Sequence, residues 1–161
     1  MSAKSGKSKD KQGSVSVNKK AYRNFELTEK FEAGMELLGT EVKSLRASQA
    51  DLDGSYARIK NQECWLVGSK IAKYEQAGAA NHEPARDRKL LLHRAEIHRI
   101  KTKLEQRGFT LVPLRIYFSS KGLAKIELAL ARGKRQYDKR KTITERQQKR
   151  DIDRGLKKYR K

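Results

Sequence analysis

The chain has 161 residues, and its 39 Lys and Arg against 19 Asp and Glu give a formal net charge of +20. Half of this excess lies in residues 132–161 and a quarter in residues 1–20. Charge concentrated at both ends cannot enter a core and indicates a polyanionic partner, for which nucleic acid is the natural candidate. No apolar run exceeds four residues, which excludes a membrane span. The single cysteine, Cys64, excludes an internal disulfide and indicates a reducing, cytoplasmic compartment.

We expect three segments along the chain. Residues 1–17 are rich in Lys, Ser and Gly and are typical of a flexible basic arm. Residues 18–131 are long enough to bury a core and are expected to form the body. Residues 132–161 hold too little apolar surface to fold alone, so this tail is expected to be disordered in free solution.

Three elements are expected in the first half of the body. Apolar residues fall on odd positions over 25–37, which predicts one long strand, bent at Gly34. Residues 40–47 are typical of a short helix capped by Thr40. Asn61-Gln62 then separates two strand-like runs and indicates a hairpin turn.

The second half begins with a Gly/Ala/Asn/Pro loop over residues 76–87. Residues 88–107 follow as the most regular helical pattern of the chain, with Asp87 as the expected cap and Gly108 as its end.

Residues 109–118 and 123–131 alternate as two strands, with their even-numbered apolar residues expected to face one interior. Their odd-numbered partners Arg115, Tyr117 and Lys125 then face solvent or a ligand. The fold class is therefore mainly β: a small β-barrel of the oligonucleotide-binding type with one long and one short helix. Small barrels of other strand order remain open.

The motifs of catalysis and metal binding are missing from the sequence. The three histidines lack ligand spacing, and there is no phosphate-binding loop or nucleophile elbow. Cys64 beside Trp65 is typical of a buried, inert thiol. We therefore expect no enzyme activity, cofactor or metal.

Several cations are candidates for RNA phosphates. Arg86, Arg88 and Lys89 are expected at the start of the long helix, where free N–H groups favour an anion. Lys43 and Arg46 on the short helix are a weaker case of the same kind.

The tail combines charge with an aromatic residue. Tyr137 stands within the basic run 132–141, so it can stack on a base while its neighbours contact phosphates. Ile152, Leu156 and Tyr159 make a thin apolar stripe, which favours a helix formed upon binding RNA.

Six sequence blocks closely resemble those of one bacterial family, the SsrA-binding proteins (small protein B). The blocks are Asn18-Lys-Lys-Ala21, Phe31-Glu-Ala-Gly34, Gly39-Thr-Glu-Val-Lys-Ser-Leu-Arg46, Arg88-Lys-Leu-Leu-Leu92, Gly133-Lys-Arg135 and Tyr137-Asp-Lys-Arg140. The resemblance implies a monomeric RNA-binding adaptor that binds the tRNA-like domain of transfer-messenger RNA. The pair would enter stalled ribosomes for trans-translation, with the tail helical in the decoding centre and the mRNA channel of 16S rRNA.

The resemblance also implies site residues. Glu32, Leu91 and Lys125 occupy positions that contact RNA in the family, and we add Asn18, Lys19 and Arg23 to this set. The decoding-centre contacts would fall on Gly133, Lys134, Tyr137, Asp138, Lys139 and Arg140.

Three other classes compete with this interpretation. A structural ribosomal protein or general RNA-binding protein would thread its basic tail permanently through rRNA. A peptidyl-tRNA hydrolase would need a Gly-Gly-Gln tripeptide, which the chain lacks. A general single-strand-binding protein would need more exposed aromatic residues than a chain with 7% aromatics can present.

Overall fold

The computed structural model describes residues 13–134. Its strands are β1 Ser14–Val17, β2 Phe25–Met35, β3 Ala50–Asp51, β4 Tyr56–Lys60, β5 Glu63–Val67, β6 Lys70–Ile71, β7 Arg88–Leu91, β8 Phe109–Phe118 and β9 Ala124–Gly133. Its helices are α1 Lys19–Asn24, α2 Gly39–Arg46, the 3-10 helix η1 Glu75–Ala80 and α3 Arg94–Leu104. Within this part of the chain, no helix has the length and hydrophobicity that crossing a membrane requires.

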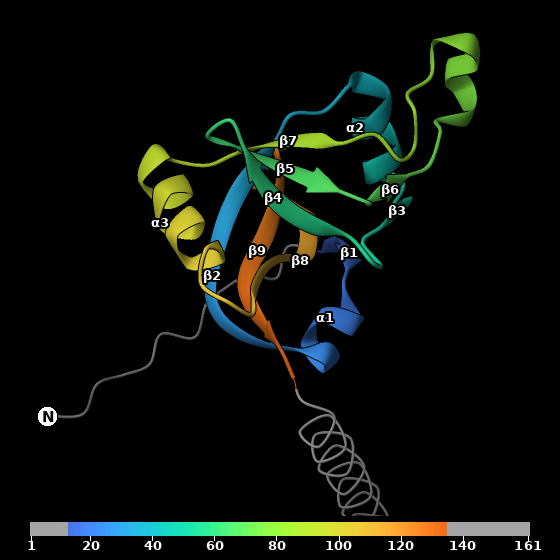
Figure 1. Cartoon of the computed structure of the whole chain (residues 1–161). Helices are drawn as coiled ribbons and strands as arrows, with labels where there is room; N and C mark the ends of the chain where they lie inside the picture. Colours follow the sequence, from blue (N-terminus) through green and yellow to red (C-terminus); the bar gives the residue numbers. More distant parts are fainter. Residues whose placement is uncertain (1–12, 135–161) are drawn as a thin grey trace, which may run out of the picture.

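Six strands form a closed antiparallel barrel. The order is β8-β4-β5-β7-β2-β9, and β9 pairs with β8 again to close the ring. β1 adds to β8 from outside, while β3 and β6 make a small separate ladder. The helices lie around the barrel, with α3 beside β2 and α1 near the end from which β9 leaves (Figure 1). The prediction of a small, mainly β barrel of the oligonucleotide-binding type is confirmed.

The core has two parts, and a bulge in β8 separates them. The main cluster fills the barrel and includes Leu111 and Ile116, together with Ile100 from α3. Val112 and Leu114 belong instead to a second cluster beneath α1. The pairing of β8 with β9 shifts register between Pro113 and Arg115, so the strand changes which face it buries. The expectation that all even-numbered residues of β8 face one interior is therefore wrong.

The hairpin and the long strand are confirmed. β4 and β5 pair directly across Asn61 and Gln62, which have φ of 51° and 60°. Two consecutive left-handed residues are the geometry of a tight hairpin turn. The short helix is also present, but its predicted cap is wrong. Leu38 is the N-cap residue, its N–H donates to Glu41 at 2.8 Å, and the Thr40 hydroxyl lies 2.9 Å from His82 Nδ1.

Order begins earlier than expected at the N-terminal side. β1 pairs with β8, so residues 14–17 are not part of a flexible arm. Asn18 then starts α1, because its side-chain oxygen accepts the Ala21 N–H at 2.9 Å. At the other boundary β9 extends to Gly133, two residues beyond the predicted end of the body.

The predicted helix over 88–107 is wrong in its first six residues. Residues 88–91 form β7, which joins β5 to β2 and so completes the barrel. Their burial alternates, with Arg88 and Leu90 buried and Leu91 exposed. Strand pairing on both sides outweighs the helical spacing of Leu90, because that spacing is a weak local preference. Asp87 is therefore no helix cap, and α3 begins only at Arg94.

Candidate RNA-binding surface

One outer face of the barrel brings together the three residues that the resemblance singled out. Strand register places Tyr117, Lys125, Gly34 and Leu91 in one row across β8, β9, β2 and β7. Directly paired residues project from the same face of a sheet. Gly34 has no side chain to separate its neighbours, and a Cβ there would meet the Leu91 Cβ at 3.4 Å. Leu91 and Lys125 are thus neighbours across a bare stretch of backbone.

A second row lies beside the first. Arg115, Glu127 and Glu32 pair across β8, β9 and β2, again in register. Two strands of the face, β8 and β9, are the pair whose odd-numbered side chains were expected to face solvent or a ligand. That expectation did not include Glu32, which comes from a strand 85 residues away from Tyr117 in the chain. We call the surface formed by the two rows the outer face.

Glu32, Tyr117 and Lys125 form a hydrogen-bonded cluster, the Glu32 cluster. One carboxylate oxygen of Glu32 accepts the Tyr117 hydroxyl, and the other accepts the Lys125 ammonium. Hydrogen bonds from Lys125 and Tyr117 hold the pKa of Glu32 below its ordinary value. The Glu32 side chain is still 51% exposed, and that of Lys125 is 33% exposed. An incoming ligand can therefore reach both charges.

A salt-bridged ladder supports the cluster from the side. Glu127 accepts Arg115 Nε at 2.6 Å and Lys30 Nζ at 3.0 Å. Burial alone would raise the pKa of Glu127, but the hydrogen bonds from Lys30 and Arg115 outweigh it and the pKa is lowered. The Arg115 guanidinium also lies 4.9 Å from the Tyr117 ring centroid. Arg115 and Tyr117 are therefore held in place before any ligand arrives.

The outer face carries a near-balance of charge rather than a basic patch. Carboxylates accept from amino and imino groups of bases, ammonium groups bind phosphates, and an exposed Leu packs on a sugar or base. Such a mixture is better suited to a folded RNA of defined shape than to polyanions in general. The basic tail, by contrast, suits phosphates of any sequence.

The predicted phosphate site at Arg86, Arg88 and Lys89 is wrong as a helix start. Arg88 is fully buried and donates to Glu41 at 2.9 Å, to Ser69 and to the carbonyl oxygen of Pro84. Arg86 donates to the same carboxylate through Nε at 2.8 Å and Nη2 at 2.5 Å. We call Glu41, Arg86 and Arg88 the Glu41 network.

The Glu41 network fixes the fold and leaves little for a ligand. Burial would raise the pKa of Glu41, but hydrogen bonds from Arg86 and Leu38 and the charge of Arg88 outweigh it and lower the pKa. The Glu41 side chain has no exposure, and that of Arg86 is 29% exposed. Arg88 therefore cannot contact RNA in this fold, because it is fully buried and its guanidinium is already paired with Glu41.

The other cations predicted to contact phosphates on the body lie at its surface. Lys89 pairs with Glu63 at the surface, and the Lys43 ammonium lies 5.1 Å from the Tyr74 ring centroid. Arg46 lies 5.9 Å from the Phe118 centroid. Lys43 and Arg46 are both exposed, so they remain candidates for phosphate contacts.

The predicted N-terminal contacts divide into two kinds. Asn18 is buried, and its amide both caps α1 and donates to the Leu52 carbonyl oxygen at 3.2 Å, so its role is structural. Lys19 and Arg23 are exposed on α1.

The tail leaves the barrel beside α1. Gly133 pairs with Phe25, and the Lys134 N–H donates to the Asn24 carbonyl oxygen at 2.9 Å. The other predicted decoding-centre residues lie outside the described residues: Tyr137, Asp138, Lys139 and Arg140.

Neither metal binding nor thiol chemistry finds support in the described part of the chain. Residues 13–134 contain no group of three His, Cys, Asp or Glu side chains placed to hold a metal ion. Burial raises the pKa of Cys64 to about 12, so its thiol stays protonated and inert at neutral pH. His82 is buried between Thr40 and the Ile71 carbonyl oxygen.

Comparison with known proteins identifies the family of this chain. The sequence model of the family described as SmpB protein matches residues 15–158. The chain belongs to the SmpB, or SsrA-binding protein, family. It is 51% identical over 142 residues to an SsrA-binding protein of Symbiobacterium thermophilum, covering 88% of this chain and 90% of that protein. An SsrA-binding protein of Thermosipho africanus is 47% identical over 146 residues, covering 91% of this chain and 98% of its own length.

The fold has a close counterpart among solved structures. A structure described as "tmRNA-SmpB: a journey to the center of the bacterial ribosome" superposes with a TM-score of 0.64 at 48% sequence identity. The match covers 79% of this chain and 92% of the other. The family model extends well beyond Lys134, so the basic tail belongs to the family pattern as well as the barrel.

Proposed function

We propose that this protein is an RNA-binding adaptor of trans-translation. It binds the tRNA-like domain of transfer-messenger RNA and delivers that RNA to stalled ribosomes in the cytoplasm. Family membership supports the role, since relatives about 50% identical to this chain are SsrA-binding proteins. The observation that carries the assignment to a surface is the Glu32 cluster, in which Glu32 and the partly exposed Lys125 are paired, with Lys125 next to Leu91 across Gly34.

The outer face and the tail have separate functions in this proposal. The outer face recognises the shaped RNA through its fixed mixture of acceptors, donors and an apolar side chain. The tail, residues 132–161, engages rRNA phosphates near the decoding centre, chiefly through the part that follows β9. Because a cationic segment gains most where phosphates surround it, the tail senses an mRNA channel that is empty of mRNA.

The deciding experiment measures affinity for a tRNA-like fragment of transfer-messenger RNA across a salt series. An unrelated structured RNA of equal length is the control. Phosphate contacts alone make both affinities fall together as salt rises. We expect the fragment to stay at least tenfold tighter at high salt, because the outer face makes contacts that counterions do not displace. Coincident curves would instead identify a general RNA-binding or structural ribosomal protein.

A truncation separates the two parts. A chain ending at Lys134 keeps all of β9 and its pairing with β2. We expect it to bind the fragment nearly as tightly as the full chain but to support no peptide tagging on stalled ribosomes. A collapse of affinity for the fragment would show that recognition lies in the tail instead.

A further inference from the structure

A groove separates α3 from the β4–β5 turn, on the far side of Leu91 from Lys125. It has a volume of about 620 Å³. Its lining consists of one turn residue and five residues of α3: Gln62, Arg94, Ala95, Ile97, His98 and Lys101. We call it the α3 groove.

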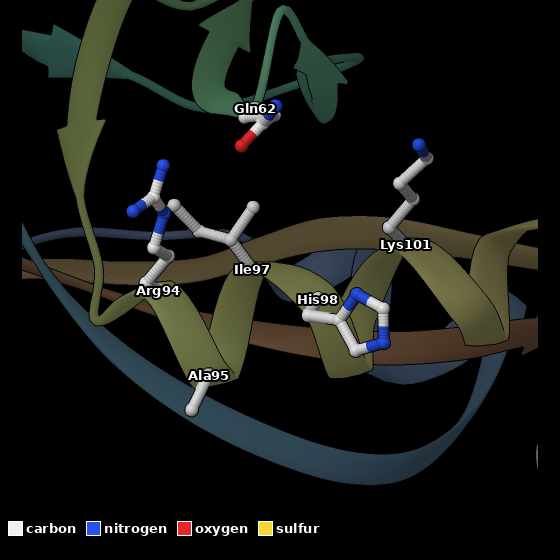
Figure 2. A pocket seen from close by; sticks show the side chains of 6 residues that line it. All are labelled: Gln62, Arg94, Ala95, Ile97, His98 and Lys101. Atoms are coloured by element: carbon white, nitrogen blue, oxygen red, sulfur yellow. The ribbon is translucent and has the colours of Figure 1, made fainter.

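The lining residues follow helical spacing. Arg94, Ile97 and Lys101 stand at i, i+3 and i+7, so they share one side of α3. Figure 2 shows these three side chains on the side of the helix that faces Gln62. Seven residues of helix span about 10 Å, so the two cations flank a groove floor made by Ile97.

The polar groups of the groove are available to a ligand. Within residues 13–134, no hydrogen bond or ion pair engages the side chains of Gln62, Arg94 or Lys101. Two carboxylates close to these residues in the chain have other partners: Glu63 pairs with Lys89, and Glu96 accepts the His93 N–H at 2.9 Å. The lining of the groove itself holds two cations and no carboxylate, so it is positively charged.

Gln62 lies at a backbone position that glycine would adopt with less strain. Its φ of 60° is in the left-handed region, where glycine sits without strain and is preferred in tight hairpin turns. Glycine would leave the turn without a side chain over the groove. The strained glutamine instead places a donor and an acceptor opposite the two cations, and such strain is a pointer to function.

The α3 groove also adjoins the outer face. Leu91, which is 53% exposed, ends β7 only three residues before Arg94. The pairing of Cys64 with Leu90 brings the start of β5, and hence the turn at Gln62, beside the end of β7. An RNA lying across Lys125, Gly34 and Leu91 continues toward this groove.

We propose that the α3 groove binds the sugar-phosphate backbone of the same RNA. Arg94 and Lys101 pair with phosphates, Ile97 contacts a ribose, and Gln62 hydrogen-bonds a 2′-hydroxyl or a base edge. This inference rests on the proposed function, because it extends the outer face by a second contact region. It assigns to the RNA a path across β9, β2 and β7 into α3.

The test is a pair of double variants that remove equal charge. R94Q/K101Q removes the groove cations, and K103Q/R107Q removes two exposed cations that do not line the groove. Affinity for the tRNA-like fragment is measured for both across a salt series, with thermal unfolding as the check on folding. We expect the groove variant to lose about tenfold in affinity and its salt slope to fall by about 1.5, while the control changes little.

Gln62→Gly is the second variant. Glycine relieves the left-handed strain, so thermal stability should hold or rise, while affinity for the fragment falls two- to fivefold by loss of one or two weak hydrogen bonds, of about 0.5–1 kcal/mol. A loss of binding together with a loss of stability would mean that the residue is structural and would overturn its assigned role.

The outcomes distinguish this inference from the function on which it rests. If the unaltered protein does not prefer the fragment over unrelated RNA, the proposed function fails. If it does prefer the fragment but R94Q/K101Q and K103Q/R107Q bind equally, only the groove inference fails. Normal fragment binding by R94Q/K101Q with lost tagging would also overturn it, because the groove would then serve a ribosomal partner.

Discussion

Glu41 and Glu32 each collect donors from distant parts of the chain, and the two clusters use the same chemistry in opposite environments. Glu41 has no exposed side-chain surface and is enclosed by Arg86 and Arg88. Glu32 lies on the outer face with half of its side chain exposed, held by Lys125 and Tyr117. Both clusters contain residues that sequence reasoning assigned to RNA.

Burial decides which cluster holds the fold and which can meet a ligand. Breaking a buried pair leaves a charge without water or partner, and that is strongly unfavourable. An exposed pair contributes little to stability, since water replaces either partner readily. The Glu32 cluster can therefore exchange its internal bonds for bonds to RNA, whereas the Glu41 network cannot.

The largest effect is expected from Arg88→Met. Methionine keeps much of the volume but leaves Glu41 short of one buried partner and Ser69 and Pro84 without their donor. We expect the free energy of unfolding to fall by about 3–5 kcal/mol, measured by urea denaturation. A loss below about 1 kcal/mol would contradict the structural role of the network.

Acid should weaken the same network. The pKa of Glu41 is lowered in the fold, so its contribution to stability is fully present above the ordinary value of 4.5 and is lost as pH falls through the lowered value. We expect the urea concentration at the unfolding midpoint to decrease once the pH is below about 4.5. In Glu41→Gln the midpoint should depend less on pH in this range. An identical pH profile in Glu41→Gln would show that other carboxylates govern acid unfolding.

Substitutions in the Glu32 cluster should lower the affinity for RNA and leave the stability of the fold nearly unchanged. Lys125→Gln and Glu32→Gln each remove one charged hydrogen-bond partner, worth about 1.5–3 kcal/mol where it meets RNA. We expect affinity for the tRNA-like fragment to fall roughly ten- to hundredfold, while the urea midpoint changes little. Lys103→Gln, which removes an exposed charge on α3 away from the outer face, is the matched control. Normal binding by both cluster variants would overturn the site.

Tyr117→Phe should have the smallest effect. It removes only the hydroxyl that donates to Glu32, so the carboxylate loses one of its two fixed donors. Affinity should fall about two- to tenfold, from the 0.5–1.5 kcal/mol of one hydrogen bond. The salt slope should stay unchanged, because no charge is lost, and NMR titration should show the pKa of Glu32 rising toward its ordinary value. An unmoved pKa would mean that Tyr117 does not position Glu32.

The fold class, the hairpin and the terminal strands could be predicted because their signals are local. Alternation over 109–118 and the Asn61-Gln62 turn depend on a few adjacent residues. β7 could not be predicted in the same way. Leu90 has helical spacing with Ile97 and Ile100, and only pairing with β5 and β2, each distant in the chain, makes residues 88–91 a strand.

The site was predictable only in part, for a related reason. Lys125 was expected on an exposed face from alternation, and Glu32 and Leu91 came from resemblance to the family. The burial of Arg88 could not be predicted from the sequence, because its partner Glu41 is distant in the chain and no local pattern connects the two residues. The alternating pattern also predicted that Tyr117 lies on the same face as Lys125. Its hydrogen bond to Glu32 could not be predicted, because the two residues are 85 positions apart in the chain.

The most direct test compares two cationic residues that sequence reasoning treated alike. The affinity for the tRNA-like fragment is measured for Lys125→Gln and for Arg88→Lys, which keeps a positive charge at the position. The conditions are ones in which urea denaturation shows that both variants are folded. We predict that Lys125→Gln loses at least tenfold in affinity with normal stability, and that Arg88→Lys loses stability with normal affinity. Weak binding by folded Arg88→Lys together with normal binding by Lys125→Gln would contradict this prediction.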